Sequence, residues 1–267
     1  MDILRRELAP VADEAWKYLD EQAAQVLKTQ LSARTLVDFD GPHGITLGAV
    51  NLGRLDISAT DAGGEVPWGV RRVLPLVELR IPFFMDQLEI DNVSRGARDI
   101  ADEPLREAAR KLALLEERAI YLGFPEGRIE GIIPRAAHEP LTLPGNADDY
   151  PRIVADAVNA LHAAGVGGPY WLVLGTQPFY ALRSVGATGY PAARIVRQLI
   201  DGDILWSPAL DGGLLLSKRG GDFEMTVGQD IVIGYAHHDR YKVELYLTES
   251  FTFRVLEPLA AVALRAG

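Results

Sequence analysis

Residues 219–255 read RGGDFEMTVGQDIVIGYAHHDRYKVELYLTESFTFRV and carry the clearest secondary-structure pattern in the chain. The last thirteen residues alternate, because one parity is apolar, interrupted only by Glu249, and the other is mostly polar. This period-two pattern predicts a long strand with one buried face. Two shorter β-rich runs, Phe223–Val227 and Ile231–Tyr235, precede it and are separated by turn-forming residues. We therefore predict an antiparallel meander.

Glu249 is unusual because it lies on the apolar face of the predicted long strand. A buried carboxylate without a partner is costly, so we expect a cationic or hydrogen-bonding group beside it. The expected source is a basic residue of a helix predicted at residues 102–122 or of a ribbon predicted at residues 45–84.

Two long amphipathic helices are predicted, at residues 10–31 and 102–122. Their apolar residues recur at spacings of three and four, which gives each helix one apolar face. Pro10 and Pro104 suit a first helical turn, and Gly123 suits a helix end. Residues 34–39 are predicted to form a short strand between the first helix and the ribbon.

Residues 45–84 are the least usual segment of the chain. Two β-like runs, at about 46–58 and 66–83, flank residues 60–64, whose sequence TDAGG suits the tip of a hairpin. A lone two-stranded ribbon is at best marginally stable in water. Its many apolar side chains need a cover, which either the main sheet of the same chain or another subunit could supply.

Residues 131–221 are richer in proline and glycine and alternate short helices with short strands. We predict helices at residues 151–164, 176–185 and 192–200, and strands at residues 170–174, 204–206 and 214–217. This pattern predicts a distinct α/β unit, inserted between the second long helix and the meander. The last apolar run, at residues 259–264, is too short to be a membrane anchor.

The composition is that of an acidic globular protein, with 267 residues, 48% apolar and 24% charged, and a formal net charge of −10. The absence of a basic run argues against a free nucleic-acid binder. The absence of cysteine excludes disulfides, thiolate metal sites and a cysteine nucleophile. The N-terminal residues lack the apolar core of a secretory signal. We therefore expect a soluble, cytoplasmic protein without a nucleic-acid or membrane partner.

No motif of catalysis or phosphate binding is present: the sequence has no HExxH, G-x-S-x-G, G-x-x-x-x-G-K-[ST] or G-x-G-x-x-G. The one histidine cluster is His237-His238-Asp239. Adjacent side chains on a strand point to opposite faces, so a solvated turn is favoured here over a metal site. We predict no catalytic residue and no metal.

Several separate motifs then occur in one order along nearly the whole chain. They are L-x-P-V-x-x-x-A-W at residues 8–16, LPLVELR at 74–80, EIDNVSRG at 89–96, GPY at 168–170, GYP at 189–191, RGGDF at 219–223, IGY at 233–235 and LYLTESFTF at 245–253. In these motifs the chain resembles the shell proteins of bacterial encapsulin nanocompartments, the linocin-like family.

The resemblance implies an α+β fold, that of the major capsid proteins of tailed bacteriophages. It implies a peripheral domain at residues 1–44, 84–130 and 222–267, an extended loop at 45–83 and an axial domain at 131–221. The family's subunits close into a hollow icosahedral shell and are not enzymes. The shell encloses cargo enzymes, commonly a dye-decolorising peroxidase or a ferritin-like protein, which dock through a C-terminal peptide.

The resemblance also implies two functional surfaces. The fivefold pore maps onto Ser184, Val185, Gly186, Ala187, Thr188, Gly189 and Tyr190, which are small and uncharged except for the tyrosine. The cargo groove maps onto Leu27, Leu31, Arg34, Asp38, Ile231 and Tyr235, although Leu27 and Leu31 could be plain core and Arg34 and Asp38 a surface ion pair. Residues 86–88 lack an aromatic side chain that could stack on a flavin, so no cofactor is expected.

Two other functions are compatible with the resemblance. One is a hydrolase or bacteriocin-like activity of the assembled particle, which the sequence disfavours because no nucleophile with a nearby base can be identified. The other is a phage capsid protein that packages DNA, which the acidic charge balance disfavours.

Overall fold

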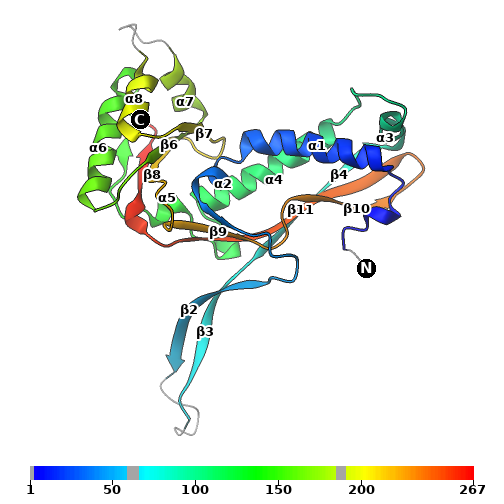
Figure 1. Cartoon of the computed structure of the whole chain (residues 1–267), viewed down its shortest axis with the longest axis horizontal. Helices are drawn as coiled ribbons and strands as arrows, with labels where there is room; N and C mark the ends of the chain where they lie inside the picture. Colours follow the sequence, from blue (N-terminus) through cyan, green and yellow to red (C-terminus); the bar gives the residue numbers. More distant parts are fainter. Residues whose placement is uncertain (1–2, 59–65, 185–190) are drawn as a thin grey trace.

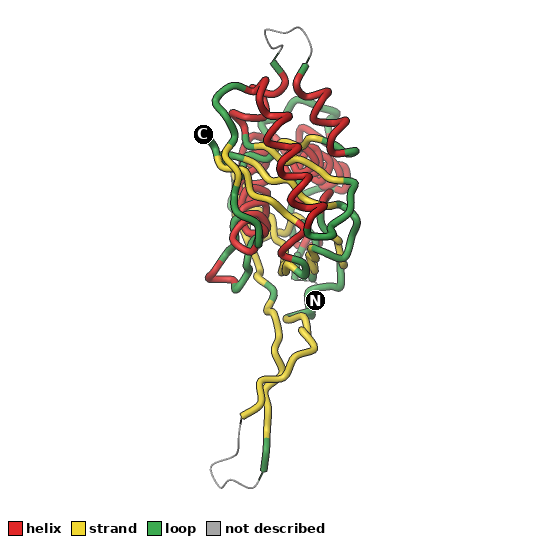
Figure 2. The backbone as a smooth tube through the Cα atoms, turned by 90° about the vertical axis from the view of Figure 1, so that its left-hand side faces the viewer, coloured by secondary structure: helices red, strands yellow, loops and turns green. Residues whose placement is uncertain are grey.

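The computed structural model describes residues 3–58, 66–184 and 191–267. These residues form two neighbouring units, each with its own sheet and helices, and a hairpin that projects from their base (Figure 1). Figure 2, turned by 90°, shows the hairpin extending away from both units.

The first sheet is organised around the strand that the alternating pattern predicts, β11 (Lys242–Val255). Its other strands are β1 (Asp38–Asp40), β4 (Val77–Asp86), β9 (Phe223–Val227) and β10 (Val232–His238). Both β9 and β10 pair with β11, each along a different part of its length, and β4 pairs with β11 over ten positions. The predicted meander is wrong in one respect, because β9 and β10 do not pair with each other but each pairs with β11. The predicted turn begins only after His238.

Two long helices cover the first sheet, α1 (Asp13–Gln30) and α4 (Glu103–Tyr121). Trp16 and Leu19 of α1 share a core with Leu112 of α4 and with Val243 and Leu245 of β11. Each large apolar side chain buried in this way contributes about 1.5–3 kcal/mol. The short helix α3 (Gln87–Ser94), which the sequence analysis missed, starts where the Asp86 side chain accepts from the Leu88 N–H at 2.9 Å. No helix in the described ranges is long and apolar enough to cross a membrane.

The strand expected at residues 34–39 is confirmed only for residues 38 and 39. Residues Ala33–Leu36 form a short helix, α2, and only the following residues enter β1. The cause is a distant contact, because the Ala33 N–H donates to Oε1 of Glu117 on α4 at 2.7 Å and so fixes the start of the helical turn.

The second sheet has the strand order β5-β12-β8-β6-β7. Its strands are β5 (Leu141–Thr142), β6 (Tyr170–Leu174), β7 (Ile204–Trp206), β8 (Gly213–Ser217) and β12 (Ala261–Arg265). Its helices are α5 (Ile132–Arg135), α6 (Tyr150–Ala163), α7 (Thr176–Arg183) and α8 (Ala192–Ile200). The expectation that residues 222–267 lie wholly with the first sheet is wrong for β12. This strand is apolar throughout its buried part and pairs with β8 instead.

The projecting hairpin pairs β2 (Ala49–Ser58) with β3 (Trp68–Pro75) in antiparallel register. The expected second arm, at residues 66–83, is divided, because the chain leaves the hairpin after Pro75 and enters the first sheet as β4. The expected tip, at residues 60–64, lies outside the described residues. The hairpin keeps six large apolar side chains at least 50% exposed: Leu55, Ile57, Val66, Trp68, Val70 and Val73.

Candidate functional site

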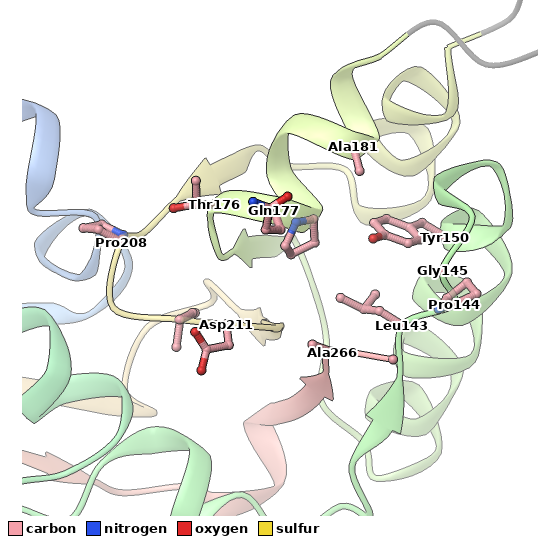
Figure 3. Close-up of a pocket in the computed structure, with 13 residues that line it drawn as sticks. Leu143, Pro144, Gly145, Tyr150, Thr176, Gln177, Ala181, Pro208, Asp211 and Ala266 are labelled. Atoms are coloured by element: carbon pink, nitrogen blue, oxygen red, sulfur yellow. The ribbon is translucent and has the colours of Figure 1, made fainter.

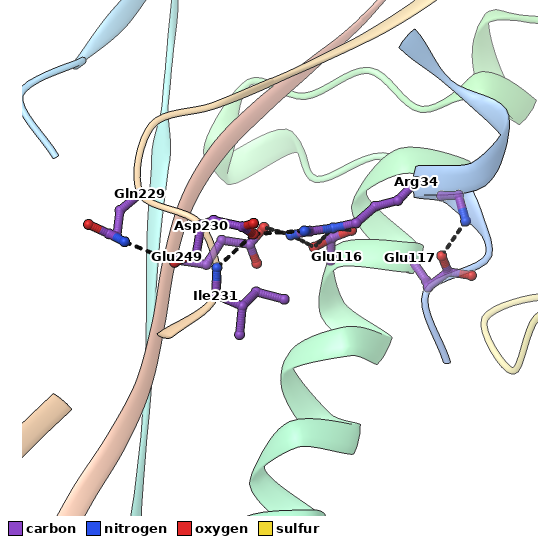
Figure 4. A network of polar contacts seen from close by, with 8 residues as sticks. Arg34, Glu116, Glu117, Gln229, Asp230, Ile231 and Glu249 are labelled. Carbon is purple, nitrogen blue, oxygen red and sulfur yellow. Dashed lines mark hydrogen bonds and ion pairs between the residues drawn. The ribbon is translucent and has the colours of Figure 1, made fainter. Parts of the chain in front are cut away.

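One buried ionic cluster joins α2, α4, β11 and the loop between β9 and β10. Nη2 of Arg34 donates to Oε1 of Glu249 and to Oε2 of Glu116, each at 2.8 Å. Nη1 of Arg34 donates to Oδ1 of Asp230 at 2.7 Å. Figure 4 shows the three carboxylates converging on one guanidinium. The cluster therefore holds together elements that are far apart in the sequence.

Carboxylates outnumber cations in this cluster. The side chains of Glu116 and Glu249 are both 0% exposed, and Oε2 of Glu249 has no hydrogen-bond partner within the described part of the chain. Burial raises the pKa of Glu249 well above its usual value, and Glu116 raises it further, whereas Arg34 lowers it only in part. Glu249 therefore holds its proton at pH values at which an exposed glutamate has lost it.

The cation beside Glu249 comes from neither place that was expected. It is Arg34 on α2, whereas the long helix α4 contributes a second carboxylate, Glu116. Burial alone lowers the pKa of Arg34, but its hydrogen bonds and the charges of its carboxylate partners raise that pKa, so the guanidinium stays charged. The expectation of a basic partner on the helix at 102–122 or on the ribbon was wrong.

A third buried carboxylate, Glu117, lies next to the cluster on α4. Its Oε2 accepts from Ser32 Oγ at 2.5 Å and from Ser207 Oγ at 2.6 Å, and its Oε1 accepts from the Ala33 N–H. Burial raises the pKa of Glu117 to about 7, although these three hydrogen bonds lower it. Ser207 follows β7, so Glu117 connects the second sheet to α4 and α2.

Of the residues predicted to line a cargo groove, Arg34 and Ile231 are linked through Asp230, and Leu27 packs against the same core as Ile231. Oδ1 of Asp230 accepts from Arg34 and also from the Ile231 N–H at 2.8 Å. Leu27 and Ile231 are partly buried and pack against the same core of the first sheet. Leu31 is half-buried at the end of α1.

Asp38 is exposed and does not pair with Arg34. Its Oδ2 accepts from the Gly221 N–H at 2.6 Å, in the turn before β9. Arg34 is only 18% exposed and is directed at its buried carboxylates. The interpretation of these two residues as a surface ion pair is therefore wrong.

Tyr235 lies on β10 and contacts the N-terminal segment, and no pattern in the sequence predicts this contact. The Tyr235 N–H donates to the Leu4 carbonyl at 2.8 Å, and Nε of Arg6 donates to the Ile233 carbonyl at 2.8 Å. The Tyr235 hydroxyl is 2.6 Å from Nδ1 of His238. Only 8% of Tyr235 is exposed, so any groove presents little of its surface.

The other histidine of the predicted turn, His237, has its Nδ1 2.8 Å from Oε2 of Glu244. Within the described ranges, no three histidine or acidic side chains are placed to hold a metal ion.

The predicted pore segment, residues 184–190, connects α7 to α8. Ser184 ends α7, and its Oγ donates to the Ala181 carbonyl at 2.7 Å. Val185, Gly186, Ala187, Thr188, Gly189 and Tyr190 lie outside the described residues.

A pocket opens between α7, the segment before α6 and the last residues of the chain (Figure 3). Its ionisable side chains are Tyr150 and Asp211. Burial raises the pKa of Tyr150, which leaves its hydroxyl protonated at neutral pH.

A family of proteins described as "Encapsulating protein for peroxidase" matches residues 1–252. A type 1 encapsulin shell protein of Rhodospirillum rubrum is 43% identical over 271 residues, covering 99% of this chain and 97% of the relative. Type 1 encapsulin shell proteins of Mycobacterium tuberculosis and Rhodococcus erythropolis are 41% and 40% identical, over 99% of this chain and 99% and 100% of their own lengths.

Solved structures show the same fold at low identity. A virus-like particle from Pyrococcus furiosus matches with a TM-score of 0.64 and 16% identity, over 94% of this chain and 99% of that one. The capsid of Myoviridae phage XM1 matches with a TM-score of 0.57 and 12% identity, over 89% and 92%. The expected fold, that of tailed-phage capsid proteins, is confirmed.

Proposed function

The chain belongs to the family of encapsulin shell proteins, which are structural proteins that self-assemble, and we propose that its shell encloses cargo enzymes docked through their C-terminal peptides. The shell is hollow and icosahedral, and its subunit is not an enzyme. The description of the matching family favours a peroxidase as cargo. The proposed cargo is a dye-decolorising peroxidase or a ferritin-like protein.

The projecting hairpin is the observation that supports self-assembly most directly. Its six exposed apolar side chains have no cover in the described part of the subunit, and a two-stranded ribbon is marginal on its own. Contiguous exposed apolar surface of this kind marks a protein–protein interface. Copies of the chain supply the cover.

The cargo groove is proposed at the junction of α1, α2, β1 and β10. Leu27, Leu31 and Ile231 provide partly buried apolar surface, which suits the side chains of an extended peptide. Asp38 provides an exposed carboxylate. Arg34 does not serve as the basic group that binds the peptide, because buried carboxylates already bind its guanidinium. It shapes the wall of the groove, and Asp38 sets the charge.

The test uses a fluorescent protein that carries the C-terminal peptide of a dye-decolorising peroxidase, expressed together with the shell. Ile231→Asp and Leu31→Asp should lower the fluorescence per purified particle several-fold, whereas Leu88→Asp, on an exposed side chain of α3, should not. Equal loading in all three variants would refute the groove. Arg34 is unsuitable for this test because its replacement also disturbs the buried cluster.

The pore is proposed at residues 184–190, between α7 and α8. These residues are all uncharged, and all of them except Tyr190 are small, so the pore selects small solutes by size. Replacement of Gly186 and Ala187 by tryptophan should slow the entry of a peroxidase substrate into loaded shells. Unchanged entry would contradict the assignment.

The subunit is proposed to divide into a peripheral domain at residues 1–44, 84–130 and 222–267, apart from the strand β12, an extended loop at 45–83 and an axial domain at 131–221. The strand β12 joins the axial sheet. We place the shell in the bacterial cytoplasm. Absorbance of purified particles at 260 nm tests the rival function, packaging of nucleic acid.

A further inference from the structure

A cleft lies where the hairpin leaves the rest of the subunit. Its walls come from β2, β3, the segment that follows α4 and the end of β11. Five arginines line it, which we call the arginine cleft: Arg54, Arg72, Arg128, Arg135 and Arg254. One carboxylate, Glu130, lines it as well.

The positive charge of the arginine cleft is only partly neutralised. Arg135 is 3.3 Å from Glu130, Arg254 is 2.7 Å from Glu224, and Arg72 pairs with Asp56. Arg54 and Arg128 are exposed and have no ion-pair partner among the residues that the structure describes. Two guanidinium groups therefore remain to bind an anionic group from outside the subunit.

The positive charge of the arginine cleft contrasts with the net negative charge of the whole chain. The chain has 37 acidic and 27 basic side chains, so two identical subunits repel each other on average. A positive cleft is the kind of surface on which an acidic part of a second copy binds favourably, because opposite potentials steer association and fix its register.

The apolar lining of the cleft distinguishes this occupant from a free anion. Leu52, Leu74 and Leu256 line the cleft together with the arginines, and Leu256 is 46% exposed. An inorganic phosphate has no apolar surface with which to cover them. A protein segment that places carboxylates beside apolar side chains satisfies both the leucines and the guanidinium groups.

We propose that the arginine cleft binds a carboxylate-bearing, partly apolar segment of a second copy of this chain. This inference rests on the self-assembly stated under the proposed function. The strands β2 and β3 form the apolar hairpin and also line the cleft. A copy that covers the hairpin therefore also lies at the mouth of the cleft. Charge pairing at the base of the hairpin and apolar contact along it then belong to one interface.

The experiment compares reassembly of dissociated shells, followed by light scattering, for the wild type and for the double variant Arg54→Glu/Arg128→Glu. The control double variant Arg98→Glu/Arg152→Glu makes the same change of charge at exposed arginines outside the cleft. At low salt the cleft variant should reassemble roughly tenfold more slowly than the control, since electrostatic steering changes association rates by at least that factor. Raising the salt should narrow the difference between the two double variants, because salt screens the charge of the cleft. Circular dichroism of the dissociated subunits verifies folding.

Equal rates and equal salt dependence in the two double variants would overturn the inference. It would also be overturned if closed wild-type shells bound tripolyphosphate and the cleft variant did not, because the cleft would then be open to free anions. The milder variant Arg54→Gln/Arg128→Gln should show a smaller effect in the same direction. If the wild type forms no particles, the proposed function itself fails, whereas a defect confined to cargo loading leaves this inference intact.

Discussion

Nη2 of Arg34 lies 2.8 Å from Oε1 of Glu249, and the two residues are 215 positions apart in the chain. The same nitrogen reaches Oε2 of Glu116. One guanidinium thus serves carboxylates on α4 and β11, which form the helix layer and the centre of the first sheet. The stability of this contact depends on Arg34 more than on any one of its partners.

Replacing Arg34 by methionine should therefore destabilise the subunit by about 3–5 kcal/mol, because it leaves buried carboxylates without a cation. The matched control is Arg110→Met, which removes an exposed ion pair with Glu103 and should cost less than about 1 kcal/mol. Thermal unfolding at a fixed protein concentration measures both. Similar unfolding temperatures for the two variants would show that the buried pairing contributes little.

Glu249→Gln should behave differently from Arg34→Met. Glutamine keeps the shape of the side chain and supplies an amide donor in place of the carboxyl proton of Glu249, and it stays neutral as the pH rises. Because raising the pH deprotonates only the glutamate, we expect the variant to be within about 1 kcal/mol of the wild type at pH 6 and to gain stability relative to the wild type at pH 8. A loss as large as that of Arg34→Met would contradict a protonated Glu249. Chemical denaturation at the two pH values gives the comparison.

Glu117 provides a separate pH dependence. Its folded-state pKa, about 7, lies above the unfolded value of 4.5, so the folded state binds the proton more tightly. The stabilisation is fully present below the unfolded pKa and is lost as pH rises through about 7. The loss approaches roughly 3 kcal/mol in size. The wild type should thus lose stability between pH 5 and pH 8.

Glu117→Gln should flatten that part of the profile, because glutamine has no proton to lose and can still accept from Ser32 and Ser207. Glu107→Gln, at an exposed position of the same helix, is the control and should leave the slope unchanged. A wild-type profile that rises across this range would refute the sign of the effect.

Much of the fold was predictable because its pattern is local and repeated. The alternation correctly placed β11, although both faces of this strand are buried and not one as predicted. The predicted bounds of β9, α4 and α6 are close to the observed ones because their patterns are also local. The interruption at Glu249 correctly indicated a buried carboxyl group that needs a partner.

What the sequence could not predict depends on contacts between distant segments. Nothing near Arg34 indicates that it reaches Glu249, or that the Ala33 N–H turns residues 33–36 into helix by donating to Glu117. The strand β12 is too short to show which sheet it joins. The cover of β10 by residues 3–6 depends on a backbone hydrogen bond from Tyr235 to Leu4 and on the Arg6 side chain, which donates to the Ile233 carbonyl, and no local sequence pattern indicates either contact.

The hairpin gives the last prediction. Ile57 is 75% exposed on β2, and Trp68 is 50% exposed on β3. If other copies cover these side chains, each contributes about 1.5–3 kcal/mol to an interface repeated in every subunit. Ile57→Asp and Trp68→Ser should therefore leave the subunit folded, because neither side chain belongs to its core, yet prevent closure of the shell. Size-exclusion chromatography should show small species in place of megadalton particles, whereas Leu88→Asp, 60% exposed on α3, should assemble normally. Shells of wild-type size from Ile57→Asp would mean that the apolar face of the hairpin stays open to solvent and that assembly depends on another surface.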